Sequence, residues 1–323
     1  MTPTPVLTAG LLVNEFAEAI ALDPKQFWGI PVALIGAALM SFGAQYQSRG
    51  LNKVERLTGE SAGSGLSIKH LLGLLSRPSW VVGTMLLGLA IAFQIAALSL
   101  APLIVVQPLG VVAMVITAVL NSRMSGVRLP KRAVVSLSLC VGGIVTFVTV
   151  AAFTAADRPV TDTKLITILI IFAVVLVVAL AGYFALRHRA IAIFYVVGAG
   201  VLYGFVATFA KAVIGRFMQN EFDWLTWVCV LALATGGLVG MLFVQNAYSS
   251  GPPDLVIAGL TVVDPLVAIL IGITVLNEAA NAPSWAIICF VMTGLIALIG
   301  VVGLAKFHPQ VGRNVLEEPR TAQ

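Results

Sequence analysis

The sequence predicts an all-α polytopic membrane protein with about nine transmembrane helices. Of its 323 residues, 59% are apolar and only 10% are charged, whereas soluble domains carry about 45–50% apolar and about 25% charged residues. The apolar residues occur in nine runs, each close to or above the roughly 18–20 residues that cross a bilayer core. All five tryptophans fall near the start of a run, where an indole ring can lie at headgroup level. This composition excludes a water-soluble fold and intrinsic disorder.

The nine runs divide the chain into two groups of four spans with one span between them. We expect an extracytoplasmic N-terminal segment (1–27), a first helical repeat (28–153), a connector helix (154–190), a second helical repeat (191–305) and a cytoplasmic tail (306–323). The loop at 47–79 is interpreted as a flexible linker before a short surface helix, or as a partial re-entrant segment. The predicted spans are 28–46, 80–100, 102–121, 133–153, 165–186, 191–210, 225–247, 255–276 and 284–305.

Lysine and arginine predict the orientation of these spans. Fourteen of the 19 basic residues lie in the loops after spans one, three, five and seven or in the C-terminal tail, and five lie on the opposite side. Cytoplasmic loops carry the excess of basic residues. We therefore expect a multi-pass protein of the cell membrane with its C-terminus in the cytoplasm and its N-terminus outside.

An internal repeat relates spans one to four to spans six to nine. Span three ends in ITAVLN (116–121), and span eight ends in ITVLN (273–277), the same string with one residue missing. Upstream, Pro108-Leu109 corresponds to Pro265-Leu266. If span five is a connector, the offset is odd and the two copies have opposite orientations, in agreement with the distribution of basic residues. Inverted repeats of this kind are typical of secondary transporters, whose binding site lies where the repeats meet.

Two stretches carry a family resemblance. The string ALSLAP (97–102) followed by VVQPLG (105–110) resembles a helix pair of NIPA-like magnesium transporters. The stretch 264–278, from Asp-Pro-Leu to Leu-Asn-Glu, resembles the EamA-type repeat of the drug/metabolite transporter superfamily. The resemblance implies an inverted-repeat permease of nine or ten helices. The chain departs from the ten-span pattern, and it has Asn121-Ser122 where its second repeat has Asn277-Glu278.

Asp264 is the strongest candidate for a functional residue, because it is the one acidic residue well inside a predicted span. The following residue, Pro265, has no N–H to donate and frees the carbonyl of Thr261. Thr261 and Asp264 are three residues apart and are expected on one helix face. The resulting cluster could bind a proton, a cation or an ammonium group. A structural role for the carboxyl, in a hydrogen bond to a neighbouring helix, is the alternative.

Weaker candidates are polar side chains in other spans. Gln94, Gln107, Gln245 and Asn246 could line a cavity that recognises polar groups of a substrate, or they could form hydrogen bonds between helices. Tyr203 could form an aromatic wall of the cavity or pack in the core. Lys211 is expected to reach the outer interface, and Glu278 is expected to be solvated at a helix end.

Enzymatic and nucleic-acid functions find no support in the sequence. There is no phosphate-binding loop motif, and the three histidines are dispersed, so we expect no enzyme activity and no cofactor. The basic residues form no continuous face, so we expect no nucleic-acid partner. The expected partners are a small-molecule or ion substrate and the lipid bilayer, and a homodimer is left open.

The leading hypothesis is a secondary-active transporter of a small solute that works by alternating access, with Asp264 as the candidate for proton coupling. One alternative is a NIPA-like magnesium or divalent-cation transporter, although Mg²⁺ prefers several oxygen ligands and the spans offer one deep carboxylate; its ligands are unknown. The other alternative is a non-transporting membrane subunit of an envelope-synthesis complex.

Overall fold

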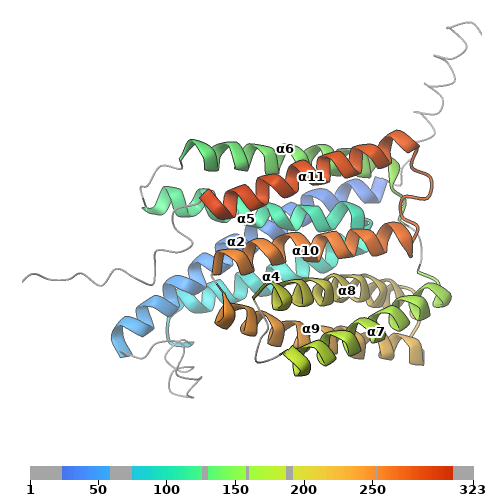
Figure 1. Cartoon of the computed structure of the whole chain (residues 1–323), viewed down its shortest axis with the longest axis horizontal. Helices are drawn as coiled ribbons and strands as arrows, with labels where there is room; N and C mark the ends of the chain where they lie inside the picture. Colours follow the sequence, from blue (N-terminus) through green and yellow to red (C-terminus); the bar gives the residue numbers. More distant parts are fainter. Residues whose placement is uncertain are drawn as a thin grey trace, which may run out of the picture.

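The computed structural model describes residues 24–58, 75–125, 130–157, 160–186, 192–251 and 253–307. Within these ranges it contains nine helices that are long and apolar enough to cross a membrane (Figure 1). The prediction of an all-α polytopic membrane protein is therefore confirmed. The helices are α2 (Pro24–Thr58), α4 (Pro78–Leu100), α5 (Leu103–Ser125), α6 (Lys131–Thr154), α7 (Asp162–Leu186), α8 (Ala192–Met218), α9 (Trp224–Ser250), α10 (Pro253–Thr274) and α11 (Ser284–Phe307).

Helix α2 is the main departure from the predicted boundaries. The first span was expected to end at residue 46, but α2 continues to Thr58 and occupies the first part of the predicted loop 47–79. Hydropathy falls after Tyr46, whereas the residues from Leu51 to Leu57 include good helix formers and neither glycine nor proline. The end of an apolar run therefore does not mark the end of this helix. Residues 1–23, 59–74 and 308–323 lie outside the described residues, together with the predictions made for them.

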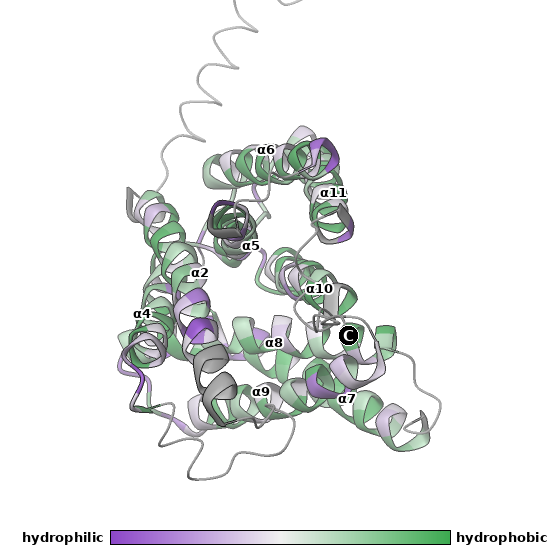
Figure 2. Cartoon of the chain, turned by 90° about the vertical axis from the view of Figure 1, so that its left-hand side faces the viewer, coloured by the Kyte–Doolittle hydropathy of each residue, from purple (hydrophilic) through white to green (hydrophobic). Residues whose placement is uncertain are grey.

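The surface of the bundle is apolar, as a bilayer requires. Large aliphatic side chains of α7, such as Ile170, Val174 and Val178, are exposed, and Figure 2 shows hydrophobic residues over most of the helices. Trp28, near the start of α2, is 68% exposed. Trp224, Trp227 and Trp285 are likewise exposed in the first turns of α9 and α11, which agrees with a position at the membrane interface.

The helix contacts repeat along the chain. Helix α2 packs on α4 and α5, and α8 packs on α9 and α10 in the same order. Helix α5 also contacts α6, as α10 contacts α11. We call α2, α4, α5 and α6 the first unit, and α8 to α11 the second unit. The units meet through α5 with α10, through α6 with α11 and through α4 with α8. Helix α7 packs on α8 and α9 (Figures 1 and 2).

The two units point in opposite directions. Along the contact between α6 and α11, Gly143 lies against Ala297 and Cys140 lies against Gly300, so residue numbers rise in one helix as they fall in the other. Helix α5 is antiparallel to α10 in the same way, because its first residues meet Glu278, which follows the end of α10. The structure therefore contains the predicted inverted repeat of four helices, one connector and four helices.

Glycines set the distance between α8 and α10. A Cβ atom placed on Gly200 would lie 2.5 Å from the Cβ atom of Val263, and one on Gly204 would lie 2.7 Å from that of Val267. No side chain fits between the helices at these two positions, so their backbones approach closely, as small residues allow in membranes. This contact holds the middle of α10, including Asp264, next to α8.

Candidate functional site

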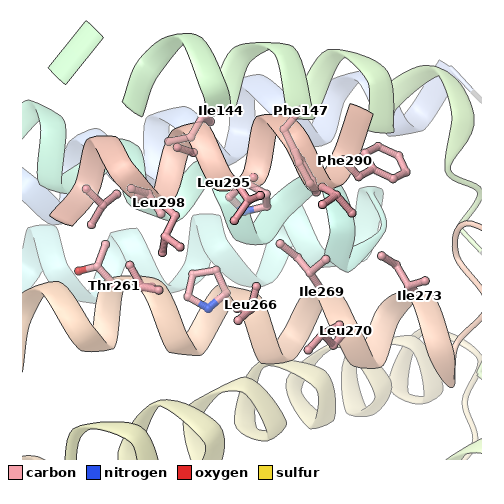
Figure 3. A pocket seen from close by; sticks show the side chains of 18 residues that line it. Ile144, Phe147, Thr261, Leu266, Ile269, Leu270, Ile273, Phe290, Leu295 and Leu298 are labelled. Atoms are coloured by element: carbon pink, nitrogen blue, oxygen red, sulfur yellow. The ribbon is translucent and has the colours of Figure 1, made fainter. Parts of the chain in front are cut away.

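A pocket of about 290 Å³ lies between the two units, at the contact of α5 and α6 with α10 and α11 (Figure 3). Pro108 and Pro265, which correspond in the repeat, both line it, so the pocket lies where the repeats meet. Thr261 is the one polar side chain in the lining, which consists of Pro108, Val111, Ile144, Phe147, Thr261, Val262, Pro265, Leu266, Ile269, Leu270, Ile273, Phe290, Val291, Gly294, Leu295, Ala297, Leu298 and Val301.

The pocket is suited to an apolar group. The described residues that line it include no charged side chain, and the hydroxyl of Thr261 donates a hydrogen bond to the carbonyl of Ile257, 2.7 Å away on its own helix. Threonine often bonds the carbonyl four residues earlier in a helix, and that bond occupies the hydroxyl proton. A bound solute would therefore place a hydrocarbon or aromatic part here, and any charged part would need another site.

Asp264 lies on the other face of α10. Pocket-lining residues of this helix alternate with residues that face α8, and the backbone nitrogen of Asp264 lies beside Gly200 of α8. The carboxylate is also within electrostatic reach of the Tyr203 phenol on α8. Asp264 and Thr261 were expected to form one polar cluster, but Thr261 faces the pocket and Asp264 is absent from its lining.

One carboxylate oxygen of Asp264, Oδ1, is buried and has no hydrogen-bond partner within the described part of the chain. A buried carboxylate oxygen without a partner is costly in free energy, because it loses its hydration and gains nothing in return. A bound proton, cation or ammonium group would remove that cost. Among the residues predicted from the sequence, Asp264 therefore has the clearest capacity to bind a ligand.

The other candidates are not brought together at the pocket. Gln94 is half-buried on α4, and Gln107 is buried on α5, 7% exposed. Tyr203 is half-buried on α8, where its ring packs against Gly240 of α9. None of the three lines the pocket, although Tyr203 is near Asp264.

Helix α9 carries the last two candidates. Gln245 is exposed, and the side-chain amide of half-buried Asn246 donates to the carbonyl of Leu242 at 2.7 Å. These residues lie outside the pocket lining as well. The structure thus separates the predicted polar residues over α4, α5, α8, α9 and α10.

Glu278, expected to be solvated, is instead buried, with 1% of its surface exposed. It lies in the link between α10 and α11, where Asn277 adopts a left-handed conformation (φ 59°) that asparagine tolerates. Its Oε1 accepts a hydrogen bond from the backbone N–H of Leu103 (2.9 Å), and its Oε2 accepts one from that of Ile104 (3.0 Å). These N–H groups belong to the first turn of α5. The N–H groups of a first turn have no acceptor within their own helix, and a negative charge beside them is favourable.

Lys211 of α8 lies beside this carboxylate, and its side chain is buried within the protein rather than extended into solvent as the sequence suggested. Its Nζ atom lies 2.8 Å from Oδ1 of Asp157 and donates to the carbonyl of Ala101 at 2.8 Å. The Nζ atom is also 3.9 Å from Oε1 of Glu278. Burial raises the pKa of Glu278, and the Lys211 charge and the two N–H donors of α5 oppose that shift only in part.

The sequence contains one indication that Glu278 is buried. The link of residues 275–283 contains one charged residue, Glu278, among mostly small and apolar ones, which is unusual for a solvated loop. Within the described ranges, no group of three or more His, Cys, Asp or Glu side chains is placed to hold a metal ion.

Comparisons with known proteins show a distant relative of this chain. The chain is similar to an uncharacterised protein of Corynebacterium glutamicum, with 27% identity over 243 residues that cover 73% of this chain and 82% of the relative. No family model and no solved structure matches the chain. The resemblance to NIPA-like and EamA-type transporters therefore stays a prediction.

Proposed function

We propose that the protein is a secondary-active transporter of a small solute, in which Asp264 binds the coupling proton or cation. One observation carries this proposal: α10 lines a pocket between two oppositely oriented units with one face, and on the other it holds a buried carboxylate oxygen that has no hydrogen-bond partner among the described residues. Ionisable residues within transmembrane segments are rare, and they commonly mark ion and substrate pathways. Inverted repeats supply the two related conformations that alternating access needs.

Helix α10 couples the two sites in this account. Protonation or cation binding neutralises Asp264 and removes the cost of burying its charge beside α8. The free energy of that step then depends on how α10 packs on Gly200 and Gly204. A solute in the pocket touches the same helix at Pro265 and Ile269, so its binding and the neutralisation of Asp264 bias one shared element.

The lining of the pocket supports a solute with an apolar body. A hydrated ion such as Mg²⁺ would find one side-chain oxygen ligand among the lining residues, the hydroxyl of Thr261, whereas it prefers several oxygen ligands and a carboxylate. The solute we favour is therefore organic, with a hydrocarbon or aromatic part that fills the pocket.

The test is uptake into proteoliposomes that contain the purified protein, under an imposed pH gradient. The probes are a panel of labelled neutral aromatic solutes, amino acids and lipophilic cations, with Mg²⁺ alone as a separate arm. We expect gradient-driven uptake of an organic probe, and we expect Asp264→Asn to reduce it by roughly tenfold or more, while Asp264→Glu keeps part of it.

Three results would contradict the proposal. Uptake by Asp264→Asn at the wild-type rate, with the variant folded, would remove the role of the carboxyl. Uptake of Mg²⁺ but of no organic probe would favour the divalent-cation alternative. No uptake of any probe, together with co-purification of a membrane complex, would favour a non-transporting subunit.

A further inference from the structure

We propose that Glu278, Lys211 and Asp157 form a charged latch that holds the two units together at one end of the pocket and must open for a solute to enter or leave there. The latch involves residues other than Asp264. Its role in admitting a solute rests on the proposed transport function. It lies where α5 begins and α10 ends, the end that the distribution of basic residues predicts to be extracytoplasmic.

The first part of the latch is Glu278, which belongs to the second unit and bonds the first. Its two carboxylate oxygens accept the N–H groups of Leu103 and Ile104 at the start of α5. Its own carbonyl accepts the N–H of Ala156, which follows α6 of the first unit, at 2.9 Å. One residue thus ties the α10–α11 link to two separate segments of the opposite unit.

The second part is Lys211, which makes a parallel connection from α8. Its ammonium group reaches Asp157, beyond the end of α6, and the carbonyl of Ala101, between α4 and α5. With the group 6% exposed, these contacts replace nearly all of its water. If one member of such a buried pair is lost, the other keeps an uncompensated charge, so the closed arrangement depends strongly on both.

The latch lies directly at one end of the pocket. On α10, Ile273 lines the pocket, and its neighbour Gly272 touches the latch, since a Cβ atom there would be 2.7 Å from Oε2 of Glu278. On α5, Pro108 lines the pocket one turn after Ile104. A separation of the units at Glu278 would therefore expose this end of the pocket.

The repeat makes the latch specific to one end. The position that corresponds to Glu278 in the first repeat is Ser122, which cannot ionise at physiological pH. The opposite end of the pocket therefore cannot carry the same carboxylate, and its closure has to depend on other contacts. The two ends then respond differently to the loss of a charge.

The experiment measures access to the pocket without any substrate. Gly294→Cys is the reporter, because it lines the pocket and its Cβ would meet only Phe147, at 3.9 Å. The native Cys140, Cys229 and Cys289 are replaced by alanine. A membrane-impermeant thiol reagent is applied to either side of sealed vesicles, and the rate of modification is measured.

We expect Glu278→Gln and Lys211→Met each to raise the rate from the Glu278 side by roughly tenfold or more, and to lower it or leave it unchanged from the other side. Gly272→Ala is a second kind of variant, because it displaces the carboxylate without changing any charge. It should act in the same direction. The matched control is Asp162→Asn, which breaks a bond to Arg216 at the same end but between α7 and α8 rather than between the units.

Two results would overturn the latch. Unchanged rates in all three latch variants, with wild-type elution as a single species, would show that these contacts do not close the pocket. An equal rise from both sides would show general loosening instead. The outcome is separable from the proposed function: a one-sided rise in a protein whose Asp264→Asn variant transports normally would keep the latch and reject the role of Asp264.

Discussion

Two carboxylates in the described part of the chain have oxygens removed from water, and their surroundings differ. Glu278, at one end of the bundle, has both oxygens bonded to the first turn of α5 and a lysine beside it. Asp264, in the middle of α10, has an oxygen with no partner in the described chain. A satisfied carboxylate fixes a structure, and an unsatisfied one is ready to bind something. The comparison assigns the closure of one end of the pocket to Glu278, and the binding and release of a proton or cation to Asp264.

The largest expected difference between the two residues is in stability. Glu278→Ala leaves Lys211 and two N–H groups of α5 without their partner, and we expect the free energy of unfolding to fall by roughly 3–5 kcal/mol. Asp264→Asn should leave stability unchanged or raise it, because the amide removes the cost of a buried charge. Denaturation in detergent, followed by circular dichroism, compares the two variants. Equal losses of stability in the two variants would show that the two carboxylates do not differ in how they support the fold.

A second prediction concerns the position of Asp264. Gly204→Ala places a Cβ atom 2.7 Å from that of Val267 and 3.1 Å from the backbone nitrogen of Ala268, so α8 and α10 must separate. We expect a loss of roughly 1–3 kcal/mol in stability and a fall in transport. Gly215→Ala on the same helix is the control, since nothing lies within 4 Å of its Cβ position. If both variants behave alike, close packing at Gly204 is unimportant.

A third prediction concerns pH on the Glu278 side. The groups that face Glu278 are Lys211 from α8, the N–H donors of α5 and, beyond Lys211, Asp157. Because the pKa of Glu278 is raised, it takes up a proton at a higher pH than an ordinary glutamate does. A closed latch that raises this pKa binds the proton more tightly than an open one in which the carboxyl is hydrated, so acidification should favour closure and slow modification of Gly294→Cys from that side. The Glu278→Gln variant should lack this pH dependence, and a response that persists in it would contradict the assignment.

The smallest expected effect is that of Thr261→Val. The hydroxyl bonds a carbonyl of its own helix, so its removal should change stability by no more than about 0.5 kcal/mol. Uptake of an apolar solute should stay close to the wild-type rate. A large loss of uptake with normal stability would show that Thr261 binds the solute directly, and the polar part of the pocket would then need revision.

The sequence predicted the spans and their inverted repeat because both depend on hydropathy and short local strings. It also placed Asp264 at membrane depth from its distance along a run. It missed the end of α2, where the helix outlasts its apolar residues. It also missed the burial of Glu278 and Lys211, because their partners lie more than 50 positions away in the chain and no local pattern encodes them.

The same reasoning explains the outcome for Thr261. Spacing put its hydroxyl on the face of Asp264, but residues three apart still differ in direction by about 60° on a helix. That difference is enough for Thr261 to line the pocket while Asp264 lies toward α8. The hydrogen bond from Thr261 to the carbonyl of Ile257 forms within one helix, so it requires no contact with a neighbouring helix.

The most direct test of the account is the movement of protons with the solute. Proteoliposomes that enclose a pH-sensitive dye report the internal pH when the transported solute is added. We expect the wild-type protein to change the internal pH as the solute moves, and Asp264→Asn to abolish that change while Glu278 and its network stay intact. A pH change of wild-type size in Asp264→Asn would contradict the central claim that this carboxyl carries the coupled proton.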